Sequence, residues 1–292
     1  MIPPNGTQPV HVIGASGRSG LALCRALLAD GVPVVPVVRD PTRWQAAGLA
    51  VAPRLADLAD AAALRAALAD ATRLVSAAHA RYAAKILAAA PRPARFVLMG
   101  STRKFSRFPD AHGAGVAEGE AAFLASARPG VMLHPTMIYG AAGEQNVQRL
   151  AAMLRRLRLV PLPGGGRNLV QPIHQDDVTR AIRAALEIAW DGPRVLAIAG
   201  PAPLTYAAFV RKIAAAAGLP RPRIVPVPAP VLMLIAGLGI HLPGVPRARP
   251  DEIRRLLEHK AFDIGAMVET LGVQPISLDE GLARTFARAK IG

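Results

Sequence analysis

The chain has 292 residues, 52% hydrophobic and only 4% aromatic, a length and composition that exclude a disordered protein and allow a large buried core. Its net charge of +15 comes from 30 arginines and five lysines, which are spread along the chain without a block of like charge. Because no basic stretch is interleaved with aromatic residues, a solvated basic surface explains the charge at least as well as nucleic-acid binding, which is kept as a minor alternative.

The first expected element is a strand at residues 10–14, which ends in a turn with glycines at positions 14, 17 and 20. A helical pattern rich in Ala and Leu follows as far as Asp30. Such a turn lets the backbone approach a pyrophosphate, and the free N–H groups of the helix start hold the anion. In this context a dinucleotide-binding turn is favoured over a glycine turn without a ligand. The expected cofactor contacts here are Gly14, Ser16, Gly17, Arg18 and Gly20.

Strand and helix patterns then alternate as far as Pro135, which predicts an α/β fold with a Rossmann-type, doubly wound parallel sheet. After Pro135 this rhythm breaks. We expect a Rossmann core at 1–140, to which 170–200 return, and a smaller substrate lobe at 141–169 and 201–292. The expected strands are 33–38, 49–52, 73–77, 95–99, 131–134 and 195–198, and the expected helices are 60–69, 82–90, 114–126, 145–158, 176–190, 206–217, 251–259 and 278–289.

Three other segments have their own composition. Residues 161–166 read as a Pro/Gly loop, and the proline-rich residues 220–230 read as a link between parts of the smaller lobe. The apolar residues 230–240 are too short to span a bilayer, which takes about twenty residues, so we expect a buried helix. The alternative is that 230–242 contact a membrane surface or a protein complex.

The single cysteine, Cys24, excludes an intrachain disulfide, and it has no metal-ligand neighbours, so no metal site is expected. The first residues have neither the basic start nor the apolar core of a signal peptide. A cytoplasmic protein is therefore expected, with membrane association as an alternative.

The residue after the second strand indicates which dinucleotide binds. An Asp or Glu there is typical of NAD binding, whereas this chain has Val38 followed by Arg39. Arg39 can pair with a 2′-phosphate, and Arg18 can reach the same group, which favours NADP(H) over NAD(H). Asp40, one residue further, works against this preference.

These features together resemble the short-chain dehydrogenase/reductase superfamily in its extended and atypical branches, which include NAD-dependent epimerase/dehydratase-like proteins. Besides the glycine turn, the resemblance is carried by Asp57-Leu58, the strand at 74–79, Ser101-Thr102, the 135–140 turn and the 171–178 segment. It implies that Asp57 and Leu58 lie by the adenine. It further implies that Ala77 and Ala78 line the cofactor and that Pro135 approaches the nicotinamide.

The chain departs from the family at the catalytic pair. The family's Tyr-x-x-x-Lys pair, counted back from Glu120, falls on His112 and Val116, and no tyrosine lies between Tyr82 and Tyr139. Where the family often has an arginine, just before the Pro-x-x-Ile-Tyr-Gly turn, this chain has His134. Substitute acid/base residues are therefore needed for catalysis, and the candidates are Ser101, Lys104 and His112. The bland alternative for His112 is a solvated loop residue.

The smaller lobe gives a weaker signal for a substrate. Arginines can meet a diphosphate, and the family often places an asparagine toward a nucleotide-sugar, although all these residues are equally compatible with a solvated surface. The expected substrate contacts are Thr102, Asn146, Arg149, Arg167 and His174.

Two functions follow from these expectations. The first is an NADP(H)-dependent oxidoreductase or epimerase/dehydratase that acts on a nucleotide-sugar or another small polar substrate with non-standard acid/base residues. The second is a catalytically silent NADP(H)-binding scaffold or sensor, similar to the accessory subunit of complex I. A homodimer is left open for either function.

Overall fold

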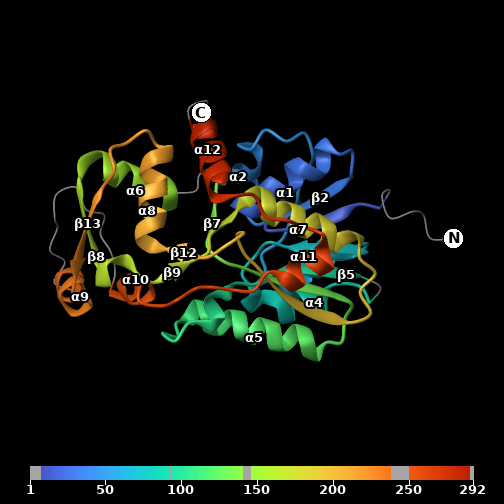
Figure 1. The fold of residues 1–292 in the computed structure, drawn as a ribbon. Helices are drawn as coiled ribbons and strands as arrows, with labels where there is room; N and C mark the ends of the chain where they lie inside the picture. The colour runs from blue at the N-terminus through green and yellow to red at the C-terminus, as the bar shows by residue number, and fades with distance from the viewer. Residues whose placement is uncertain (1–7, 93, 141–145, 238–249, 290–292) are drawn as a thin grey trace.

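A computed structural model of the protein describes residues 8–92, 94–140, 146–237 and 250–289. Its centre is a parallel sheet of seven strands, seen edge-on in the right half of Figure 1. In sheet order the strands are β11 (Pro193–Ile198), β6 (Gly130–Pro135), β5 (Arg95–Met99), β4 (Arg73–Ser76), β1 (Val10–Ile13), β2 (Val34–Val38) and β3 (Arg54–Leu55). The order reverses between β1 and β4, and ligands of such sheets bind in the crevice at this switch point.

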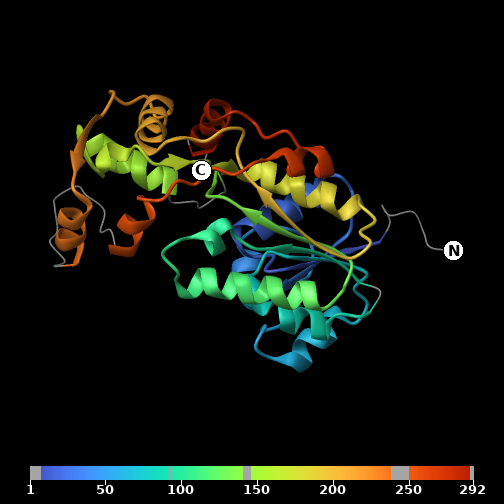
Figure 2. The ribbon, with the colours of Figure 1, turned by 60° about the horizontal axis from the view of Figure 1, so that its bottom comes forward.

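Helices cover both faces of the sheet, as the turned view in Figure 2 shows. One face carries α1 (Arg18–Ala29), α7 (Gln175–Glu187) and α11 (Gly265–Leu271), and the other carries α3 (Ala61–Leu68), α4 (Ala83–Ala89) and α5 (Ala111–Ala125). The short helices α2 (Pro41–Gln45), η1 (Ala80–Tyr82) and η2 (Thr102–Phe105) follow strands β2, β4 and β5. The predicted doubly wound α/β fold is confirmed.

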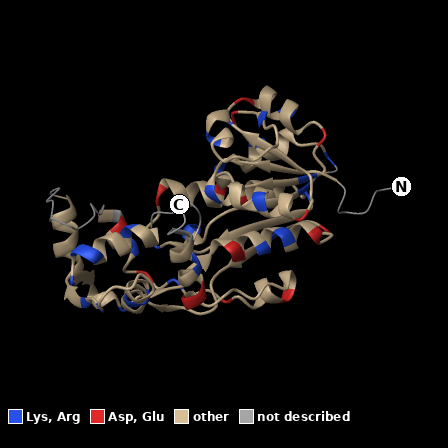
Figure 3. Cartoon of the chain, turned by 90° about the horizontal axis from the view of Figure 1, so that it is seen from above, with Lys and Arg blue, Asp and Glu red and all other residues tan. Residues whose placement is uncertain are grey.

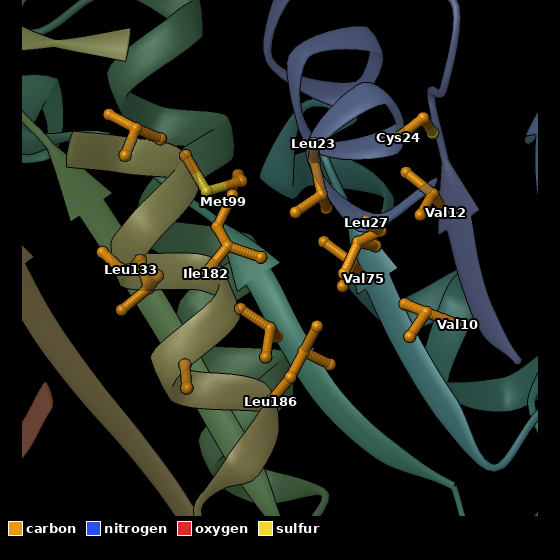
Figure 4. Packing of buried hydrophobic residues seen from close by; sticks show 14 of the residues in the cluster. Val10, Val12, Leu23, Cys24, Leu27, Val75, Met99, Leu133, Ile182 and Leu186 are labelled. Carbon is orange, nitrogen blue, oxygen red and sulfur yellow. The ribbon is translucent and has the colours of Figure 1, made fainter. Parts of the chain in front are cut away.

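The sheet buries aliphatic side chains on both faces because parallel strands are covered on either side. On the face of α1 and α7, Val10 and Val12 of β1 pack against Leu23 and Leu27 of α1, while Ile182 of α7 reaches the neighbouring strands (Figure 4). This core holds the carboxyl edge of the sheet, and with it the glycine turn, in place.

The smaller lobe lies beside this edge, in the left half of Figure 1. A second core joins its helices α6 (Asn146–Arg156), α8 (Tyr206–Ala216) and α12 (Leu278–Ala289). Its remaining elements are the strand pairs β7 (Ile138–Tyr139) with β10 (Ile173–His174), β9 (Leu169–Val170) with β12 (Leu204–Thr205) and β8 (Leu159–Pro163) with β13 (Arg223–Val227), and the helices η3 (Gly164–Gly166), α9 (Ala229–Gly237) and α10 (Pro250–Arg255).

Several expected elements need correction. The third strand is at 54–55 instead of 49–52, because only Arg54 and Leu55 pair with β2. Residues 161–166 and 220–230 are not simply loop and linker, since they contribute to β8 and β13. In a two-stranded pair each strand has a free edge, where backbone N–H groups make no hydrogen bond to another strand. Prolines, which have no N–H, are therefore tolerated there.

Helices α9, α10 and α11 also differ from expectation. The segment at 230–240 does form a helix, α9, but none of its described residues is buried, so the expected buried helix is wrong; residues 238–242 lie outside the described residues. Helix α10 ends at Arg255 rather than 259, and α11, which was not expected, packs on the sheet although its residues were assigned to the smaller lobe. Within the described ranges, no helix is long and apolar enough to cross a bilayer.

Candidate functional site

The glycine turn connects β1 to α1 at the carboxyl edge of the sheet. Gly14 has a φ of +73°, and a side chain on it would lie 3.2 Å from the backbone nitrogen of Ala78. The N–H of Gly17 donates to the carbonyl of Gly14 at 2.9 Å, and a Cβ on Gly20 would come within 2.3 Å of that carbonyl. Gly14 and Gly20 are therefore required by the tight packing of the turn, whereas a Cβ on Gly17 would lie 3.1 Å from the Gly14 carbonyl.

The start of α1 is suited to an anion. Gly17 is its N-cap, has no side chain to accept from the first helical N–H groups, and no acidic residue lies in the first turn. By contrast, Asp40, Asp60 and Asp110 cap α2, α3 and α5. The free N–H groups and the helix dipole attract a phosphate at this position. Ser16 is half-buried in the turn, and Arg18 is exposed.

The other residues expected at the cofactor flank this turn on neighbouring strands. Ala77 and Ala78 follow β4, and the N–H of Ala77 donates to the carbonyl of Ile13 at 3.0 Å. Arg39 follows β2 and is exposed, whereas the carboxylate of Asp40 accepts from the N–H of Thr42 at 2.9 Å and is thus engaged in capping. Past β3, the carboxylate of Asp57 accepts from the N–H of Ala59, and Leu58 packs partly buried against the core.

At the ends of β5 and β6, the predicted site residues Ser101 and Thr102 lie near His134, which stands where the family often has an arginine. The buried ring of His134 lies at the end of β6, and its Nδ1 accepts from the N–H of Ser101 at 3.0 Å. Gly100 makes this contact possible, since a Cβ there would lie 2.3 Å from Nδ1. Thr102 donates its hydroxyl to the carbonyl of Pro135, which ties the two strand ends together.

Glu120 joins this cluster from α5. Its carboxylate is paired with the ammonium group of Lys104 and lies 2.5 Å from Nε2 of His134. Because Nδ1 of His134 accepts a hydrogen bond, the neutral ring carries its proton on Nε2, toward Glu120. Burial, and then the charge of Lys104, lower the pKa of His134, whereas Glu120 acts in the opposite direction. Lys104 also lies over the ring of Phe105, at 4.6 Å from its centroid.

His112 lies elsewhere on α5. This helix begins at Ala111 rather than 114, so His112 is in its first turn and not in a loop. Its ring packs edge-on against His79, with the centroids 4.3 Å apart. Burial and the neighbouring His112 lower the pKa of His79 to about 4, and burial followed by the charge of Arg103 lowers the pKa of His112. Val116, the position of the family's lysine, is buried.

The expected substrate residues of the smaller lobe are dispersed. Asn146 and Arg149 are exposed on α6, and Arg167 is exposed after η3. His174 is buried: its Nδ1 accepts from the N–H of Asp176 at 3.2 Å, and its ring packs edge-on against Tyr139. His174 therefore caps the start of α7.

Sequence reasoning missed a second group of charged residues between the lobes. Glu258 is buried and accepts from the hydroxyl of Ser106 and the N–H of Arg107, and Asp110 is ion-paired with Arg103 and Arg255. They join the loop after β5 to the segment after α10. The contacts of Glu258 with Ser106 and of Arg255 with Asp110 join positions 152 and 145 apart along the chain, and no local motif marks such pairs.

Comparison with known proteins agrees with this geometry. Residues 14–127 match a family model described as NAD(P)H-binding. No curated protein matches the chain by sequence.

Solved structures match almost the whole chain at low identity. The NADPH-dependent quinone oxidoreductase QOR2 of Escherichia coli, complexed with NADPH, has a TM-score of 0.73 at 19% identity, covering 95% of this chain and 99% of that one. UDP-glucose 4-epimerase of Thermotoga maritima with UDP-glucose has a TM-score of 0.74 at 16% identity (98% and 100%). UDP-glucuronic acid 4-epimerase of Bacillus cereus, with UDP-glucuronic acid and NAD, has a TM-score of 0.73 at 17% identity (98% and 100%).

These similarities and the geometry of the turn support the same conclusion. The neighbours bind NAD in one case and NADPH in another, so they do not distinguish the two dinucleotides. Residues 14–127 match the NAD(P)H-binding family model, and nearly the whole chain shares its fold with these solved oxidoreductase and epimerase structures.

Proposed function

We propose that the protein is an NADP(H)-dependent oxidoreductase or epimerase/dehydratase for a small polar or nucleotide-linked substrate, in which Lys104 replaces the family's tyrosine as proton donor. The observation that carries this proposal is the group of Ser101, Lys104, Glu120 and His134 beside Pro135. It lies at the carboxyl edge of the sheet, where the resemblance puts the nicotinamide.

The residues of this group divide the work. The dinucleotide, when bound, supplies hydride transfer. Lys104, whose side chain is 13% exposed, is the group that donates a proton to a substrate oxygen or accepts a proton from it. Glu120 holds the ammonium group in position, and His134 fixes Glu120 from the other side, so both act as positioning residues.

Preference for NADP(H) is supported by the two exposed arginines at the adenine side. Within the described residues, neither Arg39 nor Arg18 is ion-paired with an acidic side chain, and the nearby Asp40 is engaged as a cap. A guanidinium forms bidentate hydrogen bonds with a phosphate, which NADPH carries at the 2′ position and NADH does not.

Calorimetry on the wild type, Arg39→Ala and the control Arg43→Ala tests the cofactor part. Arg43 is also exposed, but it lies on α2. We expect Arg39→Ala to weaken NADPH binding by about tenfold or more and to spare NADH. Equal loss for both dinucleotides would contradict the role of Arg39, and failure of the wild type to bind either would refute a dinucleotide enzyme.

Turnover of Lys104→Met against Lys85→Met tests the catalytic part, with Lys85 chosen because it is an exposed lysine on α4. The substrates are sugar nucleotides and polar carbonyl compounds. We expect Lys104→Met to keep NADPH binding and to lose about a hundredfold or more in kcat.

A silent scaffold is the second candidate, and it is favoured by the buried Val116 at the family's lysine position. It predicts a wild type that gains thermal stability with NADPH and turns over no substrate in the panel. Lys104→Met would then differ from the wild type in nothing but stability.

A further inference from the structure

The far end of the smaller lobe exposes a helix without a polar side chain. Helix α9 has the sequence Ala-Pro-Val-Leu-Met-Leu-Ile-Ala-Gly, and none of its residues is buried. Leu234 is 63% exposed and Val231 is 46% exposed. A helix that is apolar all round is ordinarily buried in protein or lipid, whereas the described residues, including α10, cover this one only in part.

The strands next to α9 extend this apolar surface. In the pair of β8 and β13, Leu159 lies opposite Arg223, and both are exposed, as is Val225 further along β13. Figures 1 and 2 both place β8, β13 and α9 together at the end of the molecule farthest from the sheet. We call the surface made by Leu159, Val225, Val231 and Leu234 the apolar tip.

The sequence around the apolar tip carries one sign of charge. Residues 146–175 contain five arginines and no Asp or Glu, and residues 201–250 contain five arginines and one lysine, again without an acidic residue. Arg158, Arg221 and Arg223 are exposed on or beside β8 and β13, and Figure 3 shows the Lys and Arg residues of the chain in blue. After residue 200, the first acidic residues of the sequence are in α10, which packs on α9 and also contains arginines.

We propose that the apolar tip inserts into the surface of an anionic lipid bilayer, with Arg158, Arg221 and Arg223 contacting the headgroups. An apolar helix of nine residues is too short to span a membrane but is suited to lying in its interface. The arginines complement anionic lipids. A second copy of the chain on this surface would bring like charges together across a two-fold axis, and nucleic acid would leave the apolar helix unused.

Vesicle sedimentation of the full chain tests this proposal. We compare phosphatidylcholine vesicles with and without phosphatidylglycerol, using the wild type, Leu234→Glu, the double variant Arg221→Ala/Arg223→Ala and the control Leu124→Glu. Leu124 is an exposed leucine on α5, in the other lobe. NADPH calorimetry and thermal melts check that each variant is folded.

We expect binding to the anionic vesicles only, reduced about tenfold by Leu234→Glu and by the double variant, and unchanged by Leu124→Glu. Binding should also weaken as salt is added. Absence of wild-type binding, or equal binding of Leu234→Glu, overturns the proposal. It is equally overturned if light scattering shows a wild-type dimer that Leu234→Glu converts to a monomer, because a second copy would then cover the apolar tip.

Discussion

The absence of a side chain at Gly100 leaves space for the ring of His134, and through that ring it positions Glu120 and Lys104. The imidazole occupies the space that a Cβ at position 100 would take, and from there it contacts Ser101 and Glu120. Glu120 in turn holds Lys104. The orientation of the proposed proton donor therefore depends on a backbone position that carries no chemistry of its own.

Gly100→Ala should accordingly impair turnover through His134. The new methyl group would lie 2.3 Å from Nδ1, so the ring must move and Glu120 loses its second contact. We expect NADPH binding to be retained, kcat to fall about tenfold or more, and stability to fall by about 1–3 kcal/mol. The control is Gly192→Ala, where an added Cβ has no neighbour within 4 Å. An unchanged kcat in Gly100→Ala would show that turnover does not depend on the position of His134.

At the scale of an element, α1 differs from the helices capped by side chains. Its first N–H groups are left for a ligand, whereas Asp40, Asp60 and Asp110 occupy the equivalent positions on α2, α3 and α5. A glycine N-cap reduces stability by only a few tenths of a kcal/mol relative to Ser, Thr, Asp or Asn. The start of α1 therefore keeps free N–H groups, which suit an anion, at little cost in stability.

Gly17→Asp tests this role of the helix start, because it adds a capping carboxylate where we expect a phosphate. The backbone at Gly17 is extended with a φ of −77°, which any residue can adopt, although a Cβ comes within 3.1 Å of the Gly14 carbonyl. Gly17→Ala has the same Cβ and no charge, so the two variants separate crowding from repulsion. We expect Gly17→Asp to bind NADPH about tenfold more weakly than Gly17→Ala in calorimetry. Equal affinities would contradict a phosphate at this helix start.

Sequence periodicity predicted the elements of the sheet well, because short valine-rich runs and amphipathic helices report burial directly. It failed for β13 and α9. Three prolines between 220 and 226 hid a strand that pairs only with β8, and the apolar composition of 230–237 suggested burial that the fold does not provide. The composition of a segment indicates whether its burial would be favourable, but the tertiary structure decides whether another element lies against it.

The site was predictable to a similar degree. The glycine turn and Ser101 follow from local motifs, whereas the contacts of Lys104 and His134 with Glu120 join three elements and could not be read from spacing. For His112, an error in the helix start of a few residues was enough to place it in a loop. Gly100 before Ser101 was the one local signal that a bulky group approaches the end of β5.

For the whole molecule, four buried or half-buried histidines make stability depend on pH. The pKa values of His11, His79, His112 and His134 are all lowered, in each case mainly by burial. The unfolded chain therefore binds protons near the ordinary pKa of 6.5, while the folded protein resists them, to about 4 for His79. The sign follows directly: the free energy of unfolding falls as pH drops through this window.

His79→Asn should make this dependence shallower. Asparagine can still accept the N–H of Arg81 that Nδ1 of His79 accepts at 3.1 Å, so the cap of η1 is retained. Each such histidine contributes a slope of up to about 1.4 kcal/mol per pH unit. Urea unfolding at about pH 7 and about pH 5 should show a smaller loss of stability in the variant than in the wild type. An equal loss would mean that His79 is protonated in the folded protein.

The path of residues 250–289 has a consequence for how the chain folds while it is being made. After α10, this stretch adds Met267 and Leu271 of α11 to the core of the sheet and then Leu282 of α12 to the core of the smaller lobe. Neither core is complete until these late residues are available. Although many proteins fold domain by domain from the N-terminus during synthesis, a ribosome-bound chain of this protein should remain sensitive to proteases in both lobes until α12 has emerged from the exit tunnel.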